Sequence, residues 1–473
     1  MRFLSACLAS FGIYVSAAVL GFAAETPPPN FVVIFADDLG YGDLGCYGHP
    51  SIRTPYLDRM AAEGVRFTDF YVAANVCTPS RAALLTGRLP IRNGMAGQMN
   101  KRVLYANSTG GLPREEITMA EALKDEGYAT ALIGKWHLGS PPEHSPLHHG
   151  FETFFGLPYS NDMELVPELA PSRAAYRMDP KSEWWDVPLW LNEEIVERPV
   201  NQENLTRRYT EEAVAFIERS REKPFFLYMA HTFPHVPLFA SEGFHDQSPR
   251  GRYGDTIEEI DWSTGQILET LRRSGLAENT LVVFTSDNGP WLVRDLAGGS
   301  AGLLRDGKGS TYEGGMRVPA IAWWPEKIAG GVVSREIVSC MDLFPTFLQL
   351  AGAEIPRDRV IDGVDLSPVL FGNGPSLRDT ILYYRSDELY AIRKGNFKAH
   401  FTTWTGYSRE EAERHDPPLL FQVGHDPSER FNLAENHPEI LAEIDAVRQA
   451  HLGELVPGEA QLTDGDFRGR WVR

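Results

Sequence analysis

Residues 31–40 read FVVIFADDLG, and this stretch sets the pattern for most of the chain. The run from Phe31 to Phe35 is rich in β-branched and aromatic residues and is followed closely by Asp37 and Asp38. A run so short and so apolar predicts a strand that is covered on both faces. Similar apolar runs, each ending in charged or polar residues, lie at 129–133, 225–229 and 281–284.

Helices are predicted between these strands. One opens at Pro55, and Thr118 with Glu121 predicts a capping box at the start of another. Two more are expected at 210–221 and 256–274. Strands that alternate with helices predict an α/β fold, with a large and mostly parallel central sheet flanked by helices. Ligands bind beyond the carboxyl ends of the strands in such sheets, which is where the polar residues stand.

The pattern changes after residue 372. Short strands separated by turns, followed by a helix at about 438–452, predict an antiparallel sheet with one helix. We therefore expect a catalytic domain at 25–372 and a small C-terminal α+β domain at 373–473.

Residues 158–204 are expected to form a long irregular insertion, and loops of that length are usually functional or mobile. The insertion contains Trp184, Trp185 and Trp190. Their rings either stack on a sugar or pack the insertion onto the body of the protein.

Composition limits the classes of function. The 473 residues include 45 Lys and Arg against 64 Asp and Glu, a formal charge of −19. So acidic a chain is a poor general nucleic-acid binder, because phosphate contacts need clustered basic residues.

The first residues are predicted to be a targeting segment. A basic start, an apolar stretch and small residues near position 24 predict a signal peptide at 1–24. We expect export, to the periplasm or outside the cell, with no membrane anchor after cleavage. Cys46, Cys77 and Cys340 would remain, which is no disulfide framework. Low cysteine use together with a signal peptide suggests a bacterial protein.

Two strand ends carry oxygen donors. Asp37 and Asp38 follow one strand, and Asp287 and Asn288 follow another. Close carboxylates repel unless a cation or proton intervenes. Hard oxygen donors suit Ca²⁺ or Mg²⁺ and not Zn²⁺. The alternative for each pair is turn formation or helix capping, which also favour Asp and Asn.

Cys77 is expected just outside a helix capped by Thr78, with Arg81 one turn further on. A helix N-terminus stabilises negative charge, so the residue is either a reactive thiolate or a small buried side chain. Other strand ends and loops carry cations or histidines that together predict an oxyanion substrate: Lys135, His137, His231, His235 and Lys308.

Two long motifs resemble a known family. Residues 77–87, CTPSRAALLTG, resemble the complete signature of the type I sulfatases, and 127–137, GYATALIGKWH, resemble their second signature. Residues 302–315 and 398–401 look closest to the arylsulfatase A and galactosamine-6-sulfatase branch. The resemblance covers nearly the whole mature chain and implies an alkaline-phosphatase-like fold.

The resemblance implies the chemistry. A maturation enzyme would convert Cys77 to Cα-formylglycine, and its hydrated aldehyde would attack a sulfate monoester to give a sulfo-enzyme, then alcohol and inorganic sulfate. Ca²⁺, or less readily Mg²⁺, would be bound by Asp37, Asp38, Asp287, Asn288 and residue 77.

The resemblance also implies roles for the cations. Arg81 and Lys135 would hold the hydrated aldehyde and His137 would contact its second hydroxyl. Lys135, His235, Lys308 and Ser160 would bind the sulfate, with Lys308 or His235 protonating the leaving alcohol.

The substrate is left open between an aryl sulfate and a sulfated saccharide. His400 is expected near the pocket mouth, where it would read the leaving group. The alternatives are a phosphate- or phosphonate-ester hydrolase, against which the intact CTPSR motif argues, and a non-catalytic protein that binds sulfated glycans.

Overall fold

The computed structural model describes residues 27–140, 142–169 and 179–466. The predicted signal peptide at 1–24 lies outside these residues. No helix within the described part of the chain is both long enough and apolar enough to cross a membrane.

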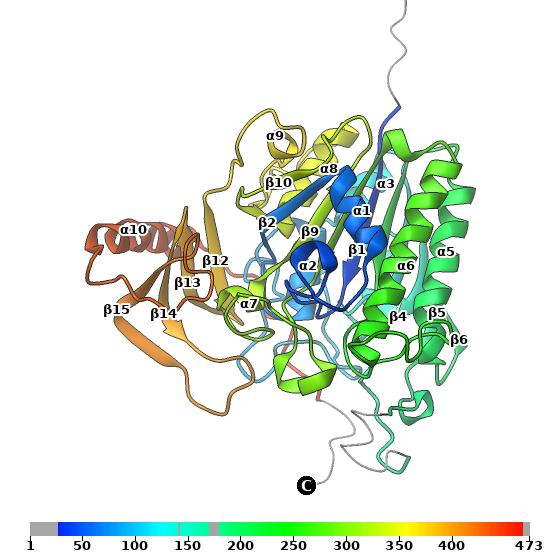
Figure 1. Ribbon diagram of the computed structural model, residues 1–473, viewed down its shortest axis with the longest axis horizontal. Coiled ribbons are helices and arrows are strands. Elements are labelled where there is room, and N and C mark those ends of the chain that lie inside the picture. Colours follow the sequence, from blue (N-terminus) through cyan, green and yellow to red (C-terminus); the bar gives the residue numbers. More distant parts are fainter. Residues whose placement is uncertain (1–26, 141, 170–178, 467–473) are drawn as a thin grey trace, which may run out of the picture.

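A large mixed sheet forms the centre of the molecule (Figure 1). Its strands, in spatial order, are β10 (Val332–Ser334), β2 (Val65–Tyr71), β9 (Arg317–Trp323), β8 (Thr280–Ser286), β1 (Asn30–Ala36), β7 (Phe225–Ala230), β3 (Ala129–Lys135), β4 (Thr153–Leu157), β5 (Leu189–Leu191) and β6 (Glu194–Glu197), with β11 (Val338–Ser339) beside β2. The five strands from β8 to β4 are parallel, whereas β9 and β5 join their neighbours antiparallel. The predicted α/β architecture is confirmed.

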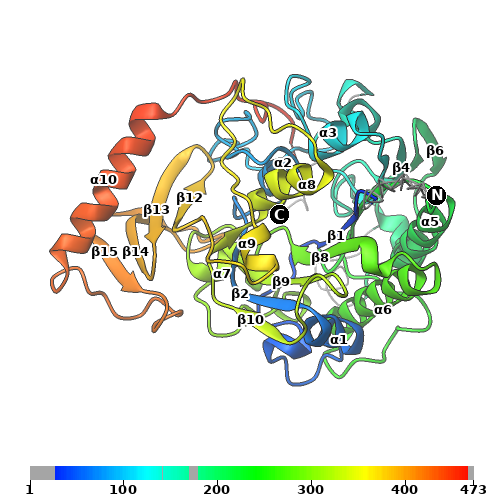
Figure 2. The same cartoon turned by 90° about the horizontal axis from the view of Figure 1, so that it is seen from above.

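Both faces of the sheet are buried, which explains the unbroken apolar runs of the strands. In β1, Phe31 and Val33 point into one core, and Val32 and Ile34 point into the other. Figure 2 shows the two helix layers on opposite sides of the sheet. The first comprises α2 (Cys77–Thr86), α3 (Met119–Asp125) and α8 (Leu343–Ala351), and the second comprises α1 (Pro55–Glu63), α5 (Leu205–Arg219) and α6 (Arg252–Arg273).

The predicted helices are present, with differences at their ends. The capping box of α3 is confirmed, since Thr118 Oγ1 accepts from Glu121 N and the Glu121 carboxylate accepts from Thr118 N. Helices α5 and α6 begin at Leu205 and Arg252, about one turn before the predicted starts. The first turn of each buries an apolar side chain, Leu205 or Tyr253, so packing extends the helix beyond the local pattern.

The C-terminal region forms a separate antiparallel sheet at the side of the body (Figure 1). Its strands are β12 (Thr380–Arg385), β13 (Glu388–Lys394), β14 (Phe397–Thr403) and β15 (Glu413–Gln422), and α10 (Pro438–Glu454) packs on β13 and β14. This sheet was predicted and is confirmed. Of two short helices, α7 (Glu313–Met316) directly precedes β9, and α9 (Ser367–Leu370) lies between the two sheets in the sequence.

The described parts of the 158–204 insertion, 158–169 and 179–204, are more regular than predicted. Strands β5 and β6 extend the central sheet beyond β4, because this segment pairs with the edge that β4 would otherwise expose. Trp184 and Trp185 are buried, and Trp185 packs edge-on against Phe239. Both rings thus pack the insertion onto the body, and Trp185 also lines the cavity described below.

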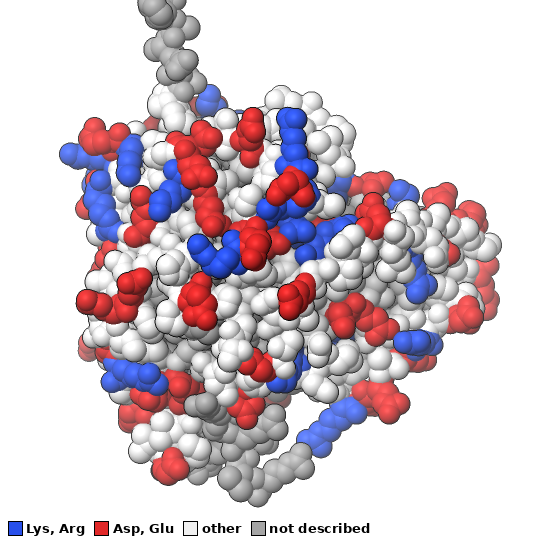
Figure 3. Space-filling model, turned by 180° about the vertical axis from the view of Figure 1, so that it is seen from behind, with Lys and Arg blue, Asp and Glu red and all other residues white. Residues whose placement is uncertain are grey.

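Charge is spread over the surface. Figure 3 shows Lys and Arg side chains interspersed with Asp and Glu over the face behind the view of Figure 1. The acidic excess therefore does not gather into one patch on that face.

Candidate active site

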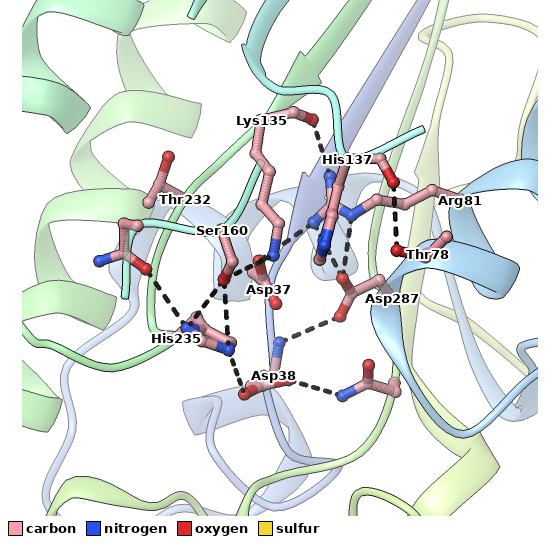
Figure 4. Close-up of polar contacts among 12 residues, drawn as sticks. Asp37, Asp38, Thr78, Arg81, Lys135, His137, Ser160, Thr232, His235 and Asp287 are labelled. Atoms are coloured by element: carbon pink, nitrogen blue, oxygen red, sulfur yellow. Dashed lines mark hydrogen bonds and ion pairs between the residues drawn. The ribbon is translucent and has the colours of Figure 1, made fainter. Parts of the chain in front are cut away.

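The parallel strands bring the predicted residues together at their carboxyl ends (Figure 4). Neighbouring strands β8, β1, β7, β3 and β4 end at a common edge, so residues far apart in sequence become neighbours. Asp287 and Asn288 follow β8, Asp37 and Asp38 follow β1, His235 follows β7, Lys135 and His137 come from β3, and Ser160 follows β4.

Cys77 lies at the start of α2, which carries it to this edge. The helix begins at Cys77 itself with Val76 as its N-cap, so the prediction that Thr78 caps the helix is wrong. Thr78 Oγ1 instead donates to the backbone oxygen of His137 at 3.1 Å and accepts from Leu104 N at 3.2 Å. The hydroxyl therefore ties α2 to the loops that surround the site.

The Cys77 side chain is not an activated thiolate. Burial raises the pKa of its thiol to about 11, an effect that Asp37 and Asp287 reinforce and that Lys135 and Lys308 only partly oppose. A thiol with so high a pKa is a poor nucleophile at neutral pH. The thiolate interpretation of the helix N-terminus is therefore not supported.

Three cations face three carboxylates at the base of the site. Arg81 Nε and Nη2 donate to Asp287 Oδ2 at 3.1 and 2.8 Å, and its Nη1 donates to the backbone oxygen of Lys135 at 2.9 Å. Lys135 Nζ donates to Asp37, and Lys308 Nζ lies 2.6 Å from Asp38 Oδ1. All six side chains are almost fully buried, so these are interactions in a water-poor environment.

The carboxylates are crowded, and their pKa values show it. Burial raises the pKa of Asp38, and the Asp37 charge adds to that effect against the Lys308 ammonium. Burial and Asp37 likewise raise the pKa of Asp287 to about 7. Asp37 is the exception: burial works against ionisation, but Lys135, His235 and Arg81 hold its pKa well below the usual value. One further cation would relieve this repulsion.

Unsatisfied oxygen atoms mark a place for such a cation. Among the described residues, Asp37 Oδ1 and Asn288 Oδ1 are buried without a hydrogen-bond partner, although Asn288 Nδ2 donates to Asp38 Oδ1 at 2.7 Å. Donor atoms of Asp37, Asp38 and His235 lie within 4.8 Å of one another. Buried acceptors left unpaired are costly, and a metal ion would satisfy them. The site therefore fits a metal.

The two histidines have defined tautomers. His137 Nε2 lies 2.9 Å from the backbone oxygen of Leu104, an acceptor only, so Nε2 carries the proton and Nδ1 is the free base. His235 Nδ1 lies 2.7 Å from the backbone oxygen of Val236, so Nε2 is its unprotonated nitrogen when the ring is neutral. Burial lowers the pKa of both rings well below the usual value.

The backbone at this edge is strained. Asp38 and His137 adopt φ values of 65° and 62°, a region that residues other than glycine rarely occupy. Such conformations persist at functional sites because the surrounding contacts over-determine them. Here Asp38 contacts Lys308 and Asn288, and His137 Nε2 donates to the backbone oxygen of Leu104.

A cavity of about 590 Å³ opens above this base. Cys77, His137, Ser160, His235 and Lys308 line it, as the sequence predicted. Trp185, from the predicted insertion, lines it too. Seven further polar and aromatic residues of the wall were not predicted from the sequence: Asn100, Arg102, Tyr105, Asp162, Trp291, Arg294 and Tyr407. Trp291 lies four residues after Asp287, so the strand-end motif at 287–288 could have indicated it. The other residues lie in loops that carry no comparable motif.

Two histidines are not part of the cavity. His231 is buried, with its pKa lowered to about 3 by burial, and it does not line the site. His400 was predicted near the pocket mouth, and that prediction is wrong. It is fully buried in β14, and its Nε2 lies 2.6 Å from Glu429 Oε1. Glu429 also lies 3.0 Å from Lys398 Nζ, so His400 belongs to a buried charge network.

The site has a buried position for a nucleophile, and cations face carboxylates at its base. Its cavity is large enough for more than a single ion. These features define an enzyme that acts on an oxyanion ester. Family models agree: the sulfatase model matches residues 29–353, and the model for the C-terminal region of aryl-sulfatase matches residues 376–472. The chain belongs to the sulfatase family and is a sulfuric ester hydrolase.

Individual relatives are similar over nearly their whole length. N-acetylgalactosamine-6-sulfatase of Canis lupus familiaris is 44% identical over 95% of this chain and 91% of its own. Arylsulfatase A of Homo sapiens is 45% identical over 94% of this chain and 92% of its own. Among solved structures, Ps i-CgsB in complex with k-i-k-neocarrahexaose is 31% identical with a TM-score of 0.77, covering 92% of this chain and 94% of that one.

Proposed function

We propose that this exported enzyme hydrolyses sulfate monoesters through a Cα-formylglycine formed at Cys77, with one divalent metal ion beside it. The observation that carries the proposal is the position of Cys77. It lies at a helix N-terminus on the wall of the cavity, where Lys135, Lys308, Asp37 and Asp287 all influence its thiol. A plain thiol with a raised pKa explains neither the cations nor the carboxylates.

The metal would be held by Asp37, Asp38, Asp287, Asn288 and the oxygen of the modified residue 77. Four of these ligands are hard oxygen donors of the side chains present, and the unpartnered Asp37 Oδ1 and Asn288 Oδ1 support the assignment. An all-oxygen set with several carboxylates favours Ca²⁺ over Mg²⁺, which keeps more of its water. When bound, the metal supplies positive charge against the negative charge of the reacting group.

The modified residue supplies a geminal diol, one hydroxyl for attack on sulfur and a second for release of sulfate. The protein's own groups position these hydroxyls. Arg81 and Lys135 offer positive charge on one side, and Lys135 Nζ also donates to Ser160 Oγ at 3.2 Å. His137 Nδ1 is buried without a partner in the described chain, and it is the nitrogen that can accept a proton from the second hydroxyl.

The leaving alcohol needs a proton, and the tautomers select the donor. His235 Nε2 is an acceptor while Nδ1 donates to Val236, so a neutral His235 has no proton to give toward the site. The Lys308 ammonium does, and it lies over the Trp291 ring at 4.5 Å beside Asp38. We assign the proton transfer to Lys308 and a contact with the sulfate oxygens to Ser160. His235 contacts a sulfate oxygen through Nε2 only when its ring is protonated, because a neutral ring with Nδ1 bound to Val236 has an acceptor at Nε2.

The substrate is a sulfated saccharide in this proposal. The relatives include N-acetylgalactosamine-6-sulfatases, and the Ps i-CgsB structure contains an oligosaccharide. The phosphate- or phosphonate-ester alternative lacks a comparable observation, since the CTPSR motif is intact at 77–81.

Peptide mass spectrometry of the active enzyme tests the proposal. Conversion replaces the CH₂–SH side chain of Cys77 by an aldehyde, with loss of the sulfur and two hydrogens and gain of one oxygen. Cys340, an equally buried thiol, is the control and should stay unmodified. Full turnover by protein in which Cys77 is an intact thiol would contradict the mechanism.

A further inference from the structure

The wall of the active-site cavity continues into a second hollow. A neighbouring cavity of about 480 Å³ shares Met99, Asn100, Arg102 and Tyr407 with the first, and it adds Arg385 and Trp404. Arg102 therefore stands at the boundary between the site of sulfate chemistry and the space beside it. A Cβ built on Gly309 would lie 3.1 Å from Arg102 Nη1, which places this guanidinium next to the loop that carries Lys308.

Two arginines share one aromatic platform in this region. The Arg385 guanidinium lies 3.7 Å from the centroid of the Trp404 ring, and the Arg102 guanidinium lies 5.7 Å from the same ring and 4.7 Å from that of Tyr407. The rings hold both guanidinium groups in place. Burial and the Arg102 charge lower the pKa of Arg385, so the two cations repel each other.

Neither cation has an ion-pair partner among the described residues, although the charge of Glu388, which itself pairs with Arg414, acts on Arg385. Within the described residues Arg102 and Arg385 form no ion pair, and Arg102 Nη1 and Arg385 Nε are buried without a hydrogen-bond partner. Arg385 Nη1 donates to the Met99 sulfur at 2.7 Å, and the Arg385 side chain also makes a hydrogen bond to Tyr390. Glu410 and Glu411 also line the second cavity, but both are exposed and neither pairs with these arginines.

Other arginines near the site are different. Arg294 lines the active-site cavity too, but its charge acts on the buried Asp162 carboxylate. Arg317 and Arg393 are paired with Asp69 at 2.9 and 2.6 Å. Arg294 Nε is also buried without a hydrogen-bond partner. Among the described residues, Arg102 and Arg385 differ in that two such guanidinium groups share one aromatic platform without an ion pair, and leaving such donors unpaired is costly. An anion between them would satisfy both.

We propose that Arg102 and Arg385 bind a second anionic group of the substrate, carried by the sugar unit next to the one that bears the scissile sulfate. The proposal rests on the proposed sulfatase function and names the substrate class: a saccharide with at least two anionic groups. A sulfate ester and a carboxylate both match the guanidinium fork. Trp404 offers a flat face beside them, on which a sugar can pack.

The test uses matched substrates. Three disaccharides carry the same 6-sulfated N-acetylgalactosamine at the non-reducing end, and the neighbouring unit is a neutral hexose, a hexuronate or a sulfated hexose. 4-Nitrophenyl sulfate, which has no second anion, is the reference. Wild-type enzyme should show a kcat/KM about 10–100-fold higher for a charged neighbour than for the neutral one, the range expected for a charge-assisted hydrogen-bond pair. The charged disaccharide with the higher kcat/KM shows whether the second anionic group is a sulfate or a carboxylate.

Arg102→Gln should remove that preference, lowering kcat/KM on the charged disaccharides at least tenfold more than on 4-nitrophenyl sulfate. Arg102→Lys should restore part of it, because it keeps the charge and loses the fork. Arg221→Gln is the matched control, since the Arg221 side chain is 66% exposed, pairs with the exposed Glu222 and lines neither cavity. A fall of the same factor on all substrates, or no change in the ranking, overturns the proposal.

Binding measured by calorimetry on Cys77→Ala protein separates this inference from the chemistry. Because this variant cannot form formylglycine, it measures substrate binding without turnover. A wrong mechanism at residue 77 therefore leaves the binding result unchanged, whereas a wrong anion site changes it. Tighter binding of the charged disaccharides that Arg102→Gln abolishes supports the second anion site even if sulfate release is absent. Equal binding of all three disaccharides overturns it.

Discussion

His400→Ala should destabilise the protein without changing its choice among sulfated substrates. The His400 ring is fully buried, and its Nε2 lies 2.6 Å from the Glu429 carboxylate. The ring also packs against Tyr312 and Phe421, with centroids 5.0 and 5.8 Å away. Loss of a buried hydrogen bond to a charged acceptor costs about 1.5–3 kcal/mol. Loss of the ring contacts adds about 0.5–1 kcal/mol.

The expected loss is thus about 2–4 kcal/mol of the free energy of unfolding, measured by urea titration. Glu429 keeps its contacts to Lys398 and to the Glu313 backbone N–H, so the network should weaken and not collapse. His437→Ala is the control, because that side chain is 39% exposed and pairs with an exposed glutamate. An unchanged free energy of unfolding, together with an altered ranking of sulfated saccharides, would refute the reasoning. His400 would then contact the substrate.

Three further predictions concern the site and its surroundings. Asp38→Ala should lose bound metal, measured by elemental analysis, and with it on the order of 10³ in kcat, because the metal stabilises several kcal/mol of developing charge; full activity of metal-free variant protein would contradict this. Lys308→Ala should slow hydrolysis of sugar sulfates by about 10²–10⁴, and that of 4-nitrophenyl sulfate much less, because a good leaving group needs no proton; equal losses would exclude Lys308 as the donor. Burial raises the pKa of Glu259 from its ordinary 4.5 to about 7. The folded protein therefore binds this proton more tightly than the unfolded chain, and Glu259 lowers stability as pH rises through that window. Glu259→Gln keeps an acceptor for Ser241 N and should gain about 3 kcal/mol relative to wild type between pH 4.5 and 8. A difference that does not vary with pH would show that Glu259 ionises normally.

The sequence by itself determined the sheet and the position of the chemistry. Apolar runs followed by Asp37, Lys135, His231 or Asp287 predict parallel strands, and parallel strands share one edge. Most residues at those ends therefore meet, although His231 directly follows β7 and does not line the cavity, whereas His235, five residues beyond the strand, does. The 77–87 motif pointed to the family, and in the structure it forms the whole of the buried helix α2 with Gly87 as its C-cap.

Only the tertiary structure decided what lies beside that edge. Arg102 and Arg385 come from segments more than 280 residues apart, and no local pattern relates them. His400 shows the same limit: the alternation of β14 says that it faces one side of its strand, but not whether that side borders a cavity or a buried carboxylate. Local sequence determines backbone periodicity and the ends of strands. The environment of a side chain depends on which distant segments pack against it, and that follows from burial over the whole chain.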